Sequence, residues 1–342
     1  MKMGNNAIKD RARGAIMGTL IGDALGLGCH WHYDLDQLKA DFGDWVSGYN
    51  DSKTDRTDRF AGIAKLRYEA GLRAGDVSQT GQVTILLIES VAEKGAYDER
   101  DFTLRLDGLL ETLDGKAFSG RYTDWAMRDV WHRRRSGADW TEAGSAADTA
   151  EAAMRSVILA ARYVKDPEAL ARLGYSDIRL THDDPYIAGQ SLSFALTLSA
   201  LISGTALSHL GEHMRRLAGI EAIRERIPSF DCLSEVANAS VAFRSPVTIE
   251  PPSLVSSLYG MACTLGFMLP AAYYLIHRYP EDFEMAVLSA VNGGGNNMAR
   301  AALTGALSGA MAGLRGIPER LISGLKDHER LLRLAENIAD KA

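Results

Sequence analysis

Several polar side chains occupy parts of the sequence that otherwise predict buried structure, and these are the residues that could do chemistry. Asp23 lies within a run of apolar residues and glycines. A carboxylate there must be paired, hydrogen-bonded or open to a cavity, so a site residue and an internal cap or ion pair both explain it. Residues 293–297 read GGGNN and precede a predicted helix, where free backbone N–H groups can bind an anion. A tight turn explains the same glycines equally well.

An aromatic segment with two histidines follows Asp23. Residues 30–34 read HWHYD, so two imidazoles two positions apart would point the same way on an extended chain. They could bind a metal, but no cysteine or acid at metal-ligand spacing accompanies them. We therefore favour an aromatic stacking wall. Residues 181–185 read THDDP, which Asp and Pro explain as the start of a helix.

The composition indicates a soluble globular protein. Of the 342 residues, 24% are charged and 46% hydrophobic, and the net charge of −6 argues against nucleic acid as the main partner. Three widely spaced cysteines suggest neither a disulfide framework nor a zinc site. The N-terminus has no apolar signal core, so we expect a cytoplasmic protein. Residues 185–211 and 253–276 are long and uncharged, yet rich in small and hydroxyl residues, and we expect buried helices rather than membrane spans.

Two glycine-faced helices are predicted to form the centre of the fold. Glycines recur every fourth residue from Gly14 to Gly26 and again from Gly305 to Gly313. Glycine costs a helix interior roughly 1 kcal/mol relative to alanine, so a close helix contact is the best explanation. Because these helices lie at opposite ends of the chain, they favour one domain over residues 1–342.

Most of the remaining sequence also has helical periodicity. Residues 27–76 are expected to be irregular apart from a short helix near Leu35–Phe42, and almost no sheet is expected. Helices are predicted at residues 8–26, 80–93, 98–113, 125–135, 148–163, from 167, from 185, and at 208–226, 230–242, 254–278, 280–291, 298–315 and 318–338.

Four motifs, in order along nearly the whole chain, resemble the ADP-ribosylglycohydrolase family. They read GAIMGTLIGDALG, GQVTILLIESV, THDDP and AVNGGGNNMARAALTGALSGAMAGLRGIPE. This family includes enzymes that remove ADP-ribose from dinitrogenase reductase and from modified arginine or serine. HWHYD, YTDWAMR and the arginine of NNMAR resemble more narrowly the branch that contains the J1 crystallins.

The resemblance implies an all-α, single-domain, orthogonally packed helical bundle with a cleft between helix ends. In active members the cleft holds two magnesium or manganese ions. A Thr-Asp-Asp triplet before the ESV-like helix and an Asp-x-Asp-Thr/Ser run after the late glycines bind these ions, which suits hard cations. The ions hold the ribose hydroxyls, and a carboxylate helps water attack the anomeric carbon.

This sequence departs from the family at those positions. The triplet falls on Ser78, Gln79 and Thr80, and a register shifted to start at Thr80 meets only Gly81 and Gln82. A Gly-Asn-Gly segment that many members have near the substrate reads Thr-Ala-Glu at 149–151. The second run falls on Asn296, Asn297, Met298 and Ala299. Four carboxylates are replaced, so no metal ligand set and no metal cofactor are expected.

The polar residues that persist are the candidate site. Arg300 is expected to fill the vacated space as a fixed cation. The candidate catalytic residues are Asp23, Asp34 and Asp124, and the candidate ligand-binding residues are His30, His32, Gln79, Gln82, His182, Asn296, Asn297 and Arg300.

Three functions stay open at this point. The first is a protein that has lost metal-dependent hydrolysis and keeps a cleft for an ADP-ribose-like or other small polar ligand, free or on an ADP-ribosylated partner. The second is a metal-independent glycohydrolase in which Asp23, Asp34 or Asp124 acts as the base, since two carboxylates in the right geometry are sufficient for glycoside cleavage. The third is a structural, crystallin-like protein. The sequence does not indicate an oligomeric state.

Overall fold

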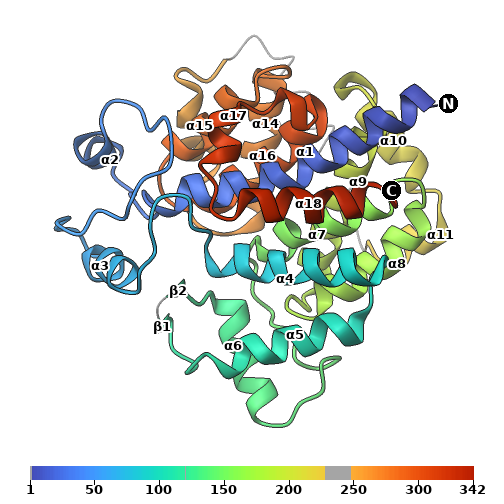
Figure 1. The fold of residues 1–342 in the computed structure, drawn as a ribbon, viewed down its shortest axis with the longest axis horizontal. Helices are drawn as coiled ribbons and strands as arrows, with labels where there is room; N and C mark the ends of the chain where they lie inside the picture. The colour runs from blue at the N-terminus through green and yellow to red at the C-terminus, as the bar shows by residue number, and fades with distance from the viewer. Residues whose placement is uncertain (1, 120, 228–247) are drawn as a thin grey trace.

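The computed structural model describes residues 2–119, 121–227 and 248–342 (Figure 1). Most of the described residues are helical, which confirms the all-α class. The strands in these ranges are β1 (Phe118–Ser119) and β2 (Arg121–Tyr122), a short antiparallel pair. The helix predicted at residues 230–242 lies outside the described residues.

The helices are numbered in the order in which they follow one another along the chain. The first part contains α1 (Lys2–Leu27), α2 (Leu35–Phe42), α3 (Ala61–Glu69), α4 (Gln79–Lys94), α5 (Glu99–Glu111) and α6 (Trp125–Arg135). The middle contains α7 (Glu151–Arg162), α8 (Pro167–Arg179), α9 (Pro185–Ser203), η1 (Leu207–His209), α10 (Leu210–Leu217) and α11 (Glu221–Arg224). The last part contains η2 (Pro252–Leu254), α13 (Val255–Tyr259), α14 (Leu265–Arg278), α15 (Phe283–Asn292), α16 (Asn297–Ala312), η3 (Leu314–Gly316), α17 (Glu319–Ser323) and α18 (His328–Ala339).

The two glycine-faced helices, α1 and α16, pack against each other in the centre of the molecule (Figure 1). A β-carbon placed on Gly18 would lie 2.1 Å from the carbonyl oxygen of Gly305, and one on Gly14 would lie 2.2 Å from that of Gly309. Real side chains cannot approach backbone so closely. The glycines are therefore required for the contact, as the spacing predicted, although Gly313 ends α16 rather than lying within it.

The long apolar helix α9 belongs to the core. Its 19 residues are enough to cross a membrane by length and composition, yet 89% of its most apolar window is buried within the fold. It packs on α7 and α8. Asp184 caps its first turn by accepting from the N–H groups of Tyr186 and Ile187, with Pro185 at the first helical position. This confirms a buried helix.

The structure differs from the predicted elements in two ways. Helix α3 lies in the segment expected to be irregular, and its N-cap, Phe60, makes no side-chain cap bond, so no start signal was available. The helices predicted at 208–226, 254–278 and 318–338 are each divided into shorter ones. Between α13 and α14, Gly260 has a φ of 125°, which a continuous helix cannot contain.

Candidate functional site

The ends of several helices surround a cavity of about 380 Å³, which we call the cleft. Its walls come from the end of α1, the 30–33 segment, α3, the first turns of α4, α7 and α16, and the β2–α6 region. The polar and aromatic lining residues are His30, Trp31, Tyr33, Phe60, Arg67, Ser78, Gln79, Thr80, Phe118, Arg121, Tyr122, Asp124, Trp125, Arg128, Thr149, Glu151, Cys263 and Asn296.

The two segments that the resemblance aligns with the family's metal ligands both line the cleft. Ser78, Gln79 and Thr80 come from the start of α4, and Asn296 and Met298 come from the start of α16. Ala299 is buried in the core. All five lining side chains are neutral. In the part of the chain that the structure describes, no group of three or more His, Cys, Asp or Glu residues could hold a metal ion.

Gln79 has one amide atom free. Its Nε2 donates to Thr123 Oγ1 at 2.9 Å, and this bond orients the side chain. Its Oε1 is buried and has no hydrogen-bond partner. A buried acceptor without a donor costs free energy unless something else supplies one, so Gln79 presents a vacant position for a ligand hydroxyl or N–H group.

Asp23 lies behind the wall formed by Ser78. It is 1% exposed, and its carboxylate accepts from the Ser78 N–H at 2.7 Å and from Ser78 Oγ at 2.6 Å. Burial raises the pKa of Asp23 to about 6, against the lowering effect of these two bonds. Gly81 leaves room for the carboxylate, since a β-carbon there would lie 2.7 Å from Asp23 Oδ2. The structure thus gives Asp23 the role of positioning the first turn of α4.

Asp124 and Glu151 place two carboxylates in the cleft. Asp124 caps α6, where its Oδ1 accepts from the Met127 N–H at 2.8 Å. Burial, and then the charge of Glu151, raise the pKa of Asp124 to about 7. Glu151 is in the first turn of α7, with Oε2 3.6 Å from Nε2 of the buried His182. A pair of this kind can supply one proton donor and one base.

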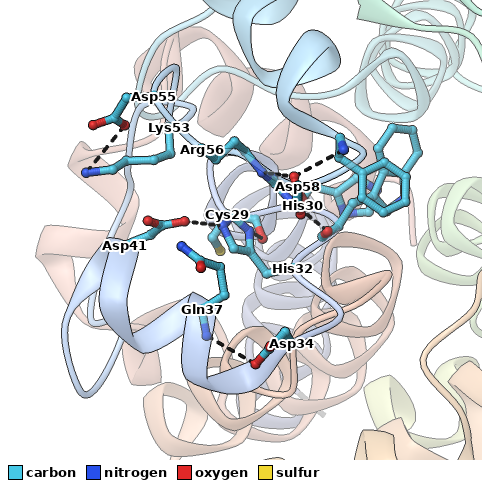
Figure 2. Close-up of polar contacts among 12 residues, drawn as sticks. Cys29, His30, His32, Asp34, Gln37, Asp41, Lys53, Asp55, Arg56 and Asp58 are labelled. Carbon is cyan, nitrogen blue, oxygen red and sulfur yellow. Dashed lines mark hydrogen bonds and ion pairs between the residues drawn. The ribbon is translucent and has the colours of Figure 1, made fainter.

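The two histidines of the HWHYD segment have separate partners. His30 lines the cleft, and its Nδ1 lies 3.0 Å from Asn297 Oδ1. Burial, and then the charge of Arg67, hold the pKa of His30 well below its usual range. His32 lies between the Cys29 carbonyl, 3.0 Å from Nδ1, and Asp41 Oδ2, 2.9 Å from Nε2 (Figure 2). They do not converge on one ligand.

Asp34 lies outside the cleft. Its side chain is exposed and caps α2, accepting from the N–H groups of Asp36 and Gln37 at 2.9 and 3.2 Å (Figure 2). This capping role accounts for the aspartate at position 34 without a role in the cleft.

Aromatic rings form one wall of the cleft, as the sequence predicted. Trp31 stacks on His30 with 4.8 Å between ring centroids, and it meets Tyr122 edge-on at 4.6 Å. Its backbone φ is 66°, in the left-handed region that residues other than glycine rarely adopt. Strain of this kind persists where surrounding bonds hold it, and here the Trp31 N–H donates to Gly295 at 3.0 Å and its carbonyl accepts from Arg56.

Backbone N–H groups of the glycine loop before α16 are already hydrogen-bonded to other segments of the chain. The N–H of Gly295 donates to the His32 carbonyl at 2.6 Å, and the N–H of Asn296 donates to Met261 at 2.8 Å. Arg300 is fully buried and donates to the carbonyls of Ala290 and Gly294. These bonds favour the tight turn over the anion site, and they place Arg300 in the support of the loop rather than in the cleft lining.

Five of the predicted ligand-binding residues do not line the cleft: His32, Asn297 and Arg300, which have the partners given above, and Gln82 and His182. Gln82, one turn after Gln79, lines a separate cavity of about 450 Å³ with Arg105 and Lys326, which we call the second cavity. His182 is buried behind Glu151, and its two ring nitrogens lie 3.0 Å from Thr149 Oγ1 and Thr181 Oγ1.

Glu151 and Arg67 are among the cleft residues that the sequence analysis did not predict. Glu151 had been noted only as the replacement of a family glycine, although an acid in the first turn of a predicted helix was visible. Arg67 lies on α3, the helix that was not predicted, and no pattern in the sequence pointed to it.

Comparisons with known proteins agree with this architecture. The sequence profile of the ADP-ribosylglycohydrolase family matches residues 4–342. An uncharacterized protein of Archaeoglobus fulgidus is 26% identical over 97% of this chain and 96% of its own length. The ADP-ribosyl-[dinitrogen reductase] glycohydrolase of Rhodospirillum rubrum is 25% identical over 93% of this chain and 91% of its own. A solved structure described as an ADP-ribosylglycohydrolase-related protein complex shares the fold, with a TM-score of 0.69, 22% identity and coverage of 98% and 99%.

Proposed function

Because the chain belongs to the ADP-ribosylglycohydrolase family, we propose that it is a member that works without the dinuclear metal site and binds an ADP-ribose-like nucleotide, or another small polar ligand, in the cleft. The ligand class rests on the family and on the R. rubrum relative, whose name specifies an ADP-ribosyl substrate. The cleft volume of about 380 Å³ falls in the range of small-molecule sites.

The observation that carries the proposal is the chemistry of the two facing segments. Ser78, Gln79, Thr80 and Asn296 offer hydroxyl and amide atoms at the positions that the resemblance assigns to the family's metal ligands. Two divalent ions need anionic oxygens to offset their charge, so these residues do not fit the metals. They do fit a polar ligand, because Gln79 Oε1 is buried and unpartnered.

Calorimetry with manganese and with ADP-ribose tests this proposal. We expect ADP-ribose to bind in excess chelator and manganese up to millimolar concentration to show no tight two-site binding. Tight binding of two manganese ions would contradict the proposal, because it would require ligands other than those at 78–80 and 296–299.

A second candidate function, metal-independent hydrolysis of a glycosidic bond, is favoured by the pair Asp124 and Glu151. With a pKa near 7, Asp124 is the better proton donor. Glu151 takes a proton from water as the water oxygen bonds to the anomeric carbon. The bond from that carbon to the leaving nitrogen or oxygen breaks, and the leaving atom receives the Asp124 proton. One water is consumed, and Asp124 and Glu151 exchange their protonation states.

Turnover of ADP-ribosyl-arginine in excess chelator separates the candidates. Hydrolysis supports the second function, with a rate that falls as the pH rises through about 7 because Asp124 must be protonated. ADP-ribose binding without turnover supports a binding protein. If the protein neither binds ADP-ribose nor hydrolyses the substrate, the structural, crystallin-like function remains.

A further inference from the structure

We propose that Arg67 anchors a phosphate group of the ligand within the cleft. This inference rests on the proposed function, in that the ligand is a phosphorylated nucleotide. It adds the ligand group that is recognised and the residue that recognises it.

Arg67 is a buried cation with few hydrogen-bond partners. It lies on α3, lines the cleft and is 3% exposed. Its Nε has no hydrogen-bond partner, and its one hydrogen bond, from Nη1 to the Leu27 carbonyl, is long at 3.5 Å. The guanidinium lies over the Trp31 ring, 5.0 Å from the centroid. Most of its five donors are therefore available to a ligand.

Among the described residues, two of the other three buried arginines have carboxylate partners, and the third, Arg300, lies outside the cleft lining and donates to the carbonyls of Ala290 and Gly294. Arg155 forms an ion pair with Asp177 at 3.0 Å and also donates to its carbonyl. Arg56 pairs with Asp58 and donates to the carbonyls of His30 and Trp31. Within residues 2–119, 121–227 and 248–342, no ion pair involves Arg67. An unpaired buried charge is costly, so an anion entering the cleft would gain a partner that is already desolvated.

The neighbours of Arg67 add to its preference for an anion. Burial, and then the charge of Arg56, lower the pKa of Arg67 to about 10, so it stays charged at neutral pH. Arg121 and Arg128 also line the cleft, against two carboxylates, of which Asp124 is partly protonated near pH 7. The lining thus carries a net positive charge.

The geometry of the side chain favours phosphate. A guanidinium presents paired donors that match two oxygens of one phosphate or carboxylate. The wall beside it is formed by Trp31, Phe60 and Tyr122, whose faces and edges suit the aromatic base of a nucleotide. A ligand with a base and phosphates satisfies both features.

The test is calorimetry of the full chain and its variants with ADP-ribose, adenosine and inorganic pyrophosphate. Arg67→Gln removes the charge but keeps a hydrogen-bonding side chain. We expect its affinity for ADP-ribose and for pyrophosphate to fall about tenfold to a hundredfold, as for loss of a charge-assisted hydrogen bond, with adenosine unchanged within about twofold. Lys65→Gln, on the same helix but exposed and paired with Glu69, is the matched control and should leave all three affinities unchanged.

The outcomes separate this inference from the proposed function. If ADP-ribose binds wild type and Arg67→Gln equally, the role of Arg67 is overturned and the proposed function stands. If pyrophosphate binds through Arg67 while ADP-ribose does not bind, the anion anchor stands and the nucleotide function fails. If nothing binds the wild type, both fail. Arg67→Lys keeps the charge but loses the paired donors of the guanidinium, so it should weaken phosphate binding less than Arg67→Gln. If Arg67→Gln does not fold, the phosphate affinity of Arg67→Lys tests the inference.

Discussion

The cleft and the second cavity differ in the state of their polar groups rather than in size. Their volumes are about 380 and 450 Å³, and both are lined in part by Arg121. In the second cavity the cations are paired: Arg105 contacts Asp101 at 2.8 Å and Glu93 at 2.6 Å, and Lys326 contacts Asp76 at 2.9 Å. In the cleft, buried atoms of Arg67, Gln79 and Glu151 lack hydrogen-bond partners. Unpaired polarity, not volume, marks the site.

The largest expected contrast concerns catalysis. If the cleft hydrolyses a glycosidic bond, Asp124→Asn should lower the rate about 100-fold or more, the usual effect of removing a general acid. Asp327→Asn changes an acid that lines the second cavity and should stay within about twofold. Single-turnover rates measure both. Equal losses in the two variants would show that the cleft has no special place in the reaction.

Removing a charged side chain should lower the free energy of unfolding in the second cavity but not in the cleft. Asp76→Asn removes a buried carboxylate that contacts Lys326 and Arg121 and accepts from the N–H of Arg73. We expect the free energy of unfolding to fall by about 1–3 kcal/mol. The loss is smaller than for a fully buried ion pair because Lys326 is largely exposed. Arg67→Gln should leave the free energy of unfolding unchanged or raise it by about 1 kcal/mol. Urea unfolding measures both, and a destabilised Arg67→Gln would mean that Arg67 has a structural partner.

Two glutamines one turn apart give a smaller and closely matched contrast. Gln79→Ala removes the vacant acceptor in the cleft and should weaken ADP-ribose binding about three- to tenfold. Gln82→Ala, on the same helix but in the second cavity, should change it less than twofold. Equal effects would place the ligand elsewhere.

The smallest effect is on the pH dependence of stability. The pKa values of Asp23 and Asp124 are raised to about 6 and 7, so between pH 4 and 7 the folded chain holds more protons than the unfolded chain. These groups therefore make stability fall as the pH rises through that window. Asp124→Asn should raise the melting temperature more at pH 8 than at pH 4.5, and equal changes at the two pH values would contradict this prediction.

Much of the fold could be predicted from the sequence because its signals are local. Helix α4, the Asp184 cap, and the glycine faces of α1 and α16 follow from periodicity, side-chain chemistry and spacing. The division of the helix predicted at 254–278 could not be predicted, since it depends on a backbone angle at Gly260.

The candidate site was less predictable because it depends on where distant segments meet. Asp124 and Gln79 were found because resemblance or burial singled them out. Asp34, a predicted catalytic residue, caps a helix instead. Arg67 could not be predicted, because α3 has no start signal and because the role of Arg67 depends on the groups that surround it in the folded chain. Whether a charge is paired is a property of the folded chain alone.

The contact between α1 and α16 also bears on how the protein is made. The face of α1 that carries Gly14 and Gly18 emerges from the ribosome well before its partner, the face of α16 with Gly305 and Gly309. Pairing between segments so far apart in the sequence is slow to form. The central pair of helices can therefore assemble only after α16 has been made, and a chain truncated before α16 would leave α1 without the helix on which its glycine face packs.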